Sequence, residues 1–267
     1  MDPSLSSQNI LPAIFGIFFG SFINTIIDRT PKYRPILFSR SKCDFCNKLL
    51  SPSELIPLFS YLFLKGKCKT CKGKINPRLP IIELLTGLMT HLVFQNHDLD
   101  FKLIPIISSI YILIAISTID LEYKIIPNKL ILPSNLIAIL ASPFWNILNT
   151  PKAFPGISGI IASFINSSLS GIGSMALPLI IFIKYPKGMG GGDWKLALFV
   201  GIILGFPSIL VAWWLTSITG GLVAIYLLTI RRKNLKYEIP YGIFISFGAL
   251  LILTFGDSVI TAIRYII

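Results

Sequence analysis

Long uncharged runs of apolar residues alternate with short polar stretches along most of this chain. The runs cover residues 10–27, 79–95, 103–119, 130–148, 154–183, 196–230 and 239–263, with Glu83 and Asp257 as the only acidic or basic interruptions. A helix needs about 17–25 mostly apolar residues to cross the hydrocarbon core of a bilayer. The pattern therefore predicts seven or eight transmembrane helices.

The run at 196–230 decides the number, because Gly205-Phe206-Pro207-Ser208 breaks it midway. Four polar stretches, 29–78, 122–129, 184–195 and 231–236, hold 21 of the 24 Lys and Arg residues. Basic loops stay on the cytoplasmic side of a membrane. The run must then cross an even number of times, as a hairpin of helices or with a short first helix. We expect an all-α polytopic membrane protein with about eight transmembrane helices and both termini outside the cytoplasm.

Composition agrees with a membrane protein and excludes an ordinary soluble enzyme. Of the 267 residues, 53% are hydrophobic and 13% are charged, whereas a soluble domain carries roughly 25% charged residues. The net charge of +12 is explained by basic cytoplasmic loops, so no nucleic-acid partner is expected. The first run follows no basic segment and lacks a small-residue cleavage site, which favours a true span over a signal peptide.

The one long polar stretch contains all four cysteines, as the pairs Cys43-Asp44-Phe45-Cys46 and Cys68-Lys69-Thr70-Cys71. Two such pairs supply four thiolates to one tetrahedral Zn²⁺ ion. A polar segment of about 50 residues is too small to build a sufficient core without such a staple. A small cytoplasmic insert held by structural zinc is therefore expected, with a redox dithiol and an iron–sulfur site as the competing readings.

Two aspartates stand at the cytoplasmic ends of spans. Asp120 ends the third run, and Asp193 follows Gly190-Gly191-Gly192 just before the sixth. Paired carboxylates at one depth share a proton, so that one acts as a base on water and the other polarises a carbonyl. The three glycines would let a substrate backbone come close to Asp193.

Simpler readings compete with this one. Asp193 would also serve as the N-cap of the following helix, and Asp120 as a solvated boundary residue beside Lys124. Lys195 has two candidate roles, holding Asp193 in its ionised form or anchoring the helix at the membrane surface. Glu83, a costly charge inside a span, would pair with Arg78 or with a neighbouring span. A phosphate-binding glycine loop fits poorly, because no strand precedes it and no GK[ST] follows.

Six motifs in order resemble those of one family, the prepilin peptidases, which are bacterial membrane aspartic proteases of the GxGD type. The resemblance rests on these segments: Gly20-Ser21-Phe22-Ile23-Asn24, the two CxxC pairs, Ser60-Tyr61-Leu62 with Gly66-Lys67-Cys68, Arg78 to Thr86, Asp120 with Ile126-Pro127-Asn128, and Gly190 to Leu196. The first cysteine pair lacks the proline that many members have between its ligands. Residues 131–185 match only in being hydrophobic.

This resemblance implies that Asp120 and Asp193 are the catalytic pair and that Cys43, Cys46, Cys68 and Cys71 bind structural zinc. It implies cleavage of type IV prepilins and pseudopilins after a glycine, at the cytoplasmic face of the bacterial inner membrane. It further implies N-methylation of the new N-terminus with S-adenosylmethionine, at a cofactor site that the sequence does not locate. The domains would be a first span at 1–28, the zinc insert at 29–79 and a seven-helix protease core at 80–267.

Two other classes of protein remain as rival hypotheses. A membrane transporter would use the two aspartates as a proton or cation relay. A structural assembly subunit would bind prepilins without cutting them.

Overall fold

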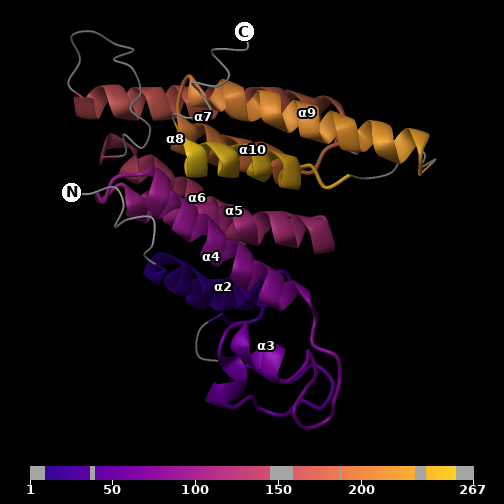
Figure 1. Cartoon of the computed structure of the whole chain (residues 1–267). Coiled ribbons are helices and arrows are strands. Elements are labelled where there is room, and N and C mark those ends of the chain that lie inside the picture. The colour runs from indigo at the N-terminus through magenta and orange to yellow at the C-terminus, as the bar shows by residue number, and fades with distance from the viewer. Residues whose placement is uncertain (1–9, 37–39, 145–158, 187, 232–238, 257–267) are drawn as a thin grey trace. The chain divides into compact units, whose positions relative to one another are not determined.

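The computed structural model describes residues 10–36, 40–144, 159–186, 188–231 and 239–256 (Figure 1). Every regular element in these ranges is helical, apart from two isolated β-bridges in the insert. Several expected features lie outside the described residues: the end of the fourth span, the start of the fifth, the basic stretch after Arg231, and Asp257 with the end of the last span. The chain divides into two compact units, Met1–Asp98 and Leu99–Ile267.

The first unit is built on two helices that run side by side, α2 (Leu11–Arg29) and α4 (Arg78–Asn96) (Figure 1). Gly16 and Gly20 of α2 lie against α4, where a Cβ at Gly20 would stand 2.7 Å from the Cα of Glu83. Glycines spaced four apart let helix backbones approach closely in a membrane, where lipid-facing apolar residues supply no driving force for association. The small residues therefore set the spacing of this helix pair.

The insert between α2 and α4 is mostly irregular, with a 3₁₀ turn η1 (Pro52–Leu55) and a short helix α3 (Phe59–Phe63). Ser51 and Glu54 form a reciprocal capping box that starts η1, which satisfies backbone donors that a short turn would otherwise leave open. The bridges Lys42↔Leu49 and Lys67↔Lys74 each close a tight loop around one cysteine pair.

The second unit contains α5 (Leu103–Tyr123), α6 (Asn128–Ala141), α7 (Gly159–Lys184), α8 (Asp193–Leu204), α9 (Ser208–Thr229) and α10 (Gly242–Phe255). α5 and α8 form its interior, since most of their residues are buried. α8 packs against α7, α6 and α10, and α10 packs against α5 and α9. A helix that is apolar on all sides is expected to be surrounded by other helices.

The break in the sixth run is confirmed, and the short first helix is the form that it takes. α8 has 12 residues and α9 has 22, with Gly205 between them at a φ of 65°. This φ lies in the left-handed region, which favours glycine. Asn166 of α7 holds the next residue, since the Phe206 N–H donates to Asn166 Oδ1 (3.1 Å) and Asn166 Nδ2 donates to the Phe206 carbonyl (3.2 Å).

Four of the described helices, α2, α5, α7 and α9, are long and apolar enough to cross a bilayer, while α6 and α10 are shorter apolar helices. The protein is therefore a multi-pass membrane protein, as its hydrophobic pattern predicted.

Candidate active site and metal site

Asp120 lies in the last turn of α5 and its side chain is buried, with the residue only 5% exposed. The helix ends just beyond it, where Lys124 takes a left-handed conformation and its N–H donates to the Asp120 carbonyl (2.9 Å). Asp120 Oδ2 makes no hydrogen bond within the described part of the chain. Such a buried carboxylate oxygen is costly to leave unpaired, which is typical of a group that acts on a substrate.

Asp193 is the first residue of α8 and is 6% exposed. Its Oδ2 accepts a hydrogen bond from the Gly190 N–H (3.0 Å), and its own N–H donates back to the Gly190 carbonyl (3.1 Å). The N-cap position belongs to Gly192, and no side chain caps the helix. The N-cap reading of Asp193 is therefore wrong, because its carboxylate turns back into the glycine loop instead of toward the first turn of the helix.

The segments that follow Asp120 and surround Asp193 pack against each other. A Cβ at Gly192 would lie 2.5 Å from the Cβ of Ile126, so only glycine leaves room for this isoleucine. Lys195 Nζ donates to Asn128 Oδ1 (2.7 Å), so in this structure it does not act on Asp193 through a direct ion pair. The segment Ile126-Pro127-Asn128 therefore packs against the glycine loop and the start of α8.

The three glycines have neighbours within the chain. A Cβ at Gly190 would stand 3.1 Å from Asp193 Oδ2, and one at Gly191 would touch the ring of Phe182 at 3.4 Å. Together with the contact of Gly192, these distances show that the loop needs small residues for its own packing around Asp193. Substrate approach stays a prediction.

A third segment, which the sequence analysis missed, meets Asp120 at the start of α10. A Cβ at Gly242 would lie 2.8 Å from Asp120 Oδ2 and 3.3 Å from Asp120 Cγ. Ile126, which follows Asp120 in the chain, contacts both this segment and the glycine loop, since a Cβ at Gly242 would lie 3.2 Å from its Cδ1 and one at Gly192 would lie 2.5 Å from its Cβ. The segments that carry the two aspartates therefore meet at Ile126, beside the N-terminal end of α10. The only signal in the sequence was Pro240-Tyr241-Gly242 at the start of the last apolar run.

The four cysteines gather at one point of the first unit, with all their sulfur atoms within 4.8 Å of one another. Cys43 Sγ and Cys71 Sγ are 3.8 Å apart, and a tetrahedral Zn²⁺ with bonds of about 2.3 Å sets sulfur atoms about 3.8 Å apart. The N–H groups of Cys71 and Thr70 lower the pKa of the Cys68 thiol to about 6. The donor set and its spacing fit a metal such as zinc.

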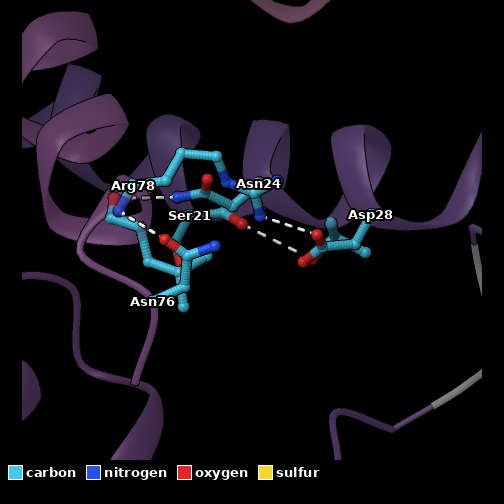
Figure 2. Close-up of polar contacts among 7 residues, drawn as sticks. Ser21, Asn24, Asp28, Asn76 and Arg78 are labelled. Atoms are coloured by element: carbon cyan, nitrogen blue, oxygen red, sulfur yellow. Dashed lines mark hydrogen bonds and ion pairs between the residues drawn. The ribbon is translucent and has the colours of Figure 1, made fainter. Parts of the chain in front are cut away.

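At the junction between the insert and the helices, Glu83 does not have the partner that the sequence suggested, which was Arg78. Arg78 forms an ion pair with Asp28 (2.6 Å; Figure 2). Asn24 Nδ2 donates to the Leu79 carbonyl (3.0 Å), which joins α2 and α4 one turn further along. Glu83 is buried and accepts the Leu58 N–H at Oε2 (2.8 Å), so it binds the insert to α4.

Fold and site together define a multi-pass membrane protein with two buried aspartates in one unit and a four-cysteine cluster in the other. The bacterial peptidase A24 N-terminal domain matches residues 14–97, and the type IV leader peptidase family matches residues 107–225. The chain belongs to this family, as its motifs indicated.

The relatives cover nearly the whole chain. A protein of Bacillus subtilis (strain 168) named prepilin leader peptidase/N-methyltransferase is 32% identical over 251 residues, which covers 93% of this chain and 94% of the relative. Proteins of the same name from Aeromonas hydrophila and Pseudomonas aeruginosa are 27% and 25% identical, each covering 92% of this chain and 90% of the relative. No solved structure matches the chain.

Proposed function

We propose that this protein cleaves the leader peptides of type IV prepilins and pseudopilins after a glycine and methylates the new N-terminus. The observation that carries the peptidase proposal is that two buried aspartates, Asp120 and Asp193, lie on segments that meet at Ile126, beside the start of α10. The names and the nearly complete coverage of the relatives support both activities.

The chemistry follows from two carboxyl groups in a site with little water. Two neighbouring buried carboxyl groups do not both ionise cheaply, so the pair would share one proton. The ionised aspartate takes a proton from water as the water oxygen attacks the scissile carbonyl carbon, and the protonated aspartate donates a hydrogen bond to the carbonyl oxygen. When the C–N bond breaks, a proton passes to the leaving nitrogen, which becomes the new amino terminus.

The cysteine cluster would hold Zn²⁺ through Cys43, Cys46, Cys68 and Cys71. Four protein ligands close the coordination shell, so the ion would stabilise the insert and take no part in hydrolysis. S-adenosylmethionine would supply the methyl group in the second activity. The described residues contain no strand that could lead into a nucleotide-binding glycine loop.

The proposed topology has eight crossings, with the insert and both aspartates on the cytoplasmic side of the inner membrane. The helices α2, α5, α7 and α9 are long and apolar enough to cross, and α4, α6, α8 and α10 would supply the other four crossings. The concentration of Lys and Arg in the stretches that would face the cytoplasm supports the orientation. The domain organisation would be the first span, the zinc insert, and a core of seven helices.

The test incubates protein in liposomes with a prepilin and S-adenosylmethionine and determines product masses. Wild type should remove the leader and add a methyl mass, while Asp120→Asn and Asp193→Asn should bind prepilin without cutting it. Glu122→Gln is the matched control, because Glu122 is exposed two residues after Asp120 and its change should leave cleavage intact. Failure of the folded wild type to cut several prepilins would contradict the peptidase proposal and favour a transporter or a scaffold.

A further inference from the structure

The insert exposes a cluster of large apolar side chains that neither the peptidase chemistry nor the zinc site uses. Residues 55–64 contain no charged residue. Within this segment the exposed side chains, here called the α3 patch, are Leu55, Ile56, Phe59, Leu62 and Phe63, with exposed fractions from 41% to 83%. Several large apolar side chains exposed within one short segment of a small polar domain indicate an interaction site.

The contacts between α2 and α4 give the depth of this patch. The two helices run antiparallel, since Asp28 pairs with Arg78, Asn24 with Leu79, and Gly20 faces Glu83. The helix α2 is long and apolar enough to cross a bilayer. Because α4 packs along it, α4 would lie in the bilayer beside α2. Arg78 and Asp28 mark the polar end of the pair (Figure 2).

The patch is attached well inside that polar end. The Leu58 N–H, which immediately precedes α3, donates to Glu83 Oε2 (2.8 Å). Glu83 lies five residues beyond Arg78, which is about 7.5 Å along a helix axis. A headgroup layer is about 5–8 Å thick on each side of the hydrocarbon core. Leu58 therefore lies near the boundary between headgroups and acyl chains, and Leu58 is held there with a φ of 59° by the buried carboxylate.

We infer that α3 is an interfacial membrane anchor, with the α3 patch buried among lipid acyl chains and the basic surface of the insert against anionic headgroups. The charges fit this partner, because residues 29–78 contain 12 Lys and Arg residues and only Asp44 and Glu54 as acids. Exposed lysines follow the patch directly at Lys65 and Lys67. Segments that lie in the interface bury their apolar side chains about 5–10 Å into this boundary.

This inference rests on the transmembrane course of α2 in the proposed function, and it assigns a role to Glu83. The carboxylate is a positioning group, which binds the backbone that leads into α3 at the depth of the interface. A docked prepilin helix and a second copy of this chain are the other conceivable occupants of the patch.

The test uses the full-length protein in vesicles of zwitterionic and anionic phospholipid, with an apolar photoreagent that generates a carbene within the bilayer. Trypsin would release residues 49–65, which contain the whole patch, and residues 43–48, which contain Phe45. Phe45 is the internal control, because it belongs to the same insert and is 68% exposed. We expect the 49–65 peptide to be labelled several-fold more than the 43–48 peptide and at a level similar to α2.

Equal, low labelling of both peptides would overturn the inference, as would labelling that a prepilin abolishes or that depends on protein density in the vesicles. Glu83→Leu removes the acceptor for Leu58 and should lower labelling of 49–65 without changing the zinc content, while Glu83→Gln, which keeps an acceptor, should restore it. Labelling does not require cleavage. An active enzyme with an unlabelled patch therefore contradicts only this inference, and an inactive enzyme with a labelled patch contradicts only the proposed function.

Discussion

Replacement of Gly242 by alanine tests the contact between α10 and Asp120 most directly. The added Cβ would stand 2.8 Å from Asp120 Oδ2, 3.2 Å from Ile126 Cδ1 and 3.3 Å from Asp120 Cγ. Ordinary contact begins at 3.4 Å, so the carboxyl group has to move by about 0.6 Å or α10 has to shift by as much. Gly242 does not have a positive φ, so alanine meets no backbone strain there.

The expected loss follows from this displacement. A misplacement of 1 Å at a catalytic group costs about 100-fold in rate, so a shift of about 0.6 Å should lower kcat by about tenfold or somewhat more. A tenfold loss corresponds to about 1.4 kcal/mol in the activation free energy. KM should change little, because the substitution alters the position of Asp120 and leaves the rest of the substrate path as it is.

The assay measures kcat and KM for prepilin cleavage in liposomes, together with the thermal unfolding midpoint. Gly221→Ala is the matched control, since Gly221 lies within α9 and a Cβ there would meet no atom within 4 Å. This control should cut at the wild-type rate and gain about 0.5–1 kcal/mol of helix stability. If Gly242→Ala also cuts at the wild-type rate while folded, the start of α10 does not hold Asp120 in its working position.

Three further outcomes are expected. Cys43→Ser should abolish zinc binding, measured by metal analysis, and should open the insert to trypsin at Lys65 to Lys74 while the helices of the second unit stay protected; unchanged zinc content would exclude the four-sulfur site. Asn166→Ala leaves the Phe206 N–H and carbonyl without their partners and should cost about 1–3 kcal/mol, seen as a lower unfolding midpoint, and an unchanged midpoint would show that Asn166 does not stabilise the α8–α9 connection. Lys195→Met removes the donor to Asn128 and should cost about 0.5–1.5 kcal/mol, with no further loss in the double variant with Asn128→Ala; additive losses would show that the pair does not interact.

The helical course of the chain was largely predictable from sequence. α5 begins at the predicted residue, Leu103, and the break at Gly205-Phe206-Pro207 falls where two helices meet. Apolar runs and helix-breaking residues are local properties, so one sequence is enough to find them. The cysteine cluster was predictable for a similar reason, because two CxxC pairs with this spacing are a local signature of a four-thiolate metal site.

The hydrogen-bond and ion-pair partners of individual polar residues were harder to predict from the sequence. Arg78 and Glu83 are five residues apart, and their opposite charges suggested a pair. They lie about 140° apart around an ideal helix, so Arg78 turns to Asp28 and Glu83 to the backbone of Leu58. Lys195 likewise reaches Asn128, 67 residues away in the chain. Such choices depend on which helix lies alongside, and spacing within one segment does not contain that information.

By itself, the sequence determined that this is a polytopic helical membrane protein with a cysteine-rich insert, and it singled out Asp120 and Asp193, because hydrophobic length, charge bias and short motifs act locally. Only the tertiary structure decided that the start of α10 stands beside Asp120, that Gly192 packs against Ile126, and that Glu83 binds the backbone of the insert. The physical reason is close packing. Whether a backbone segment can approach a carboxyl group depends on side chains from distant segments, so the role of a glycine can be seen only when its neighbours in space are known.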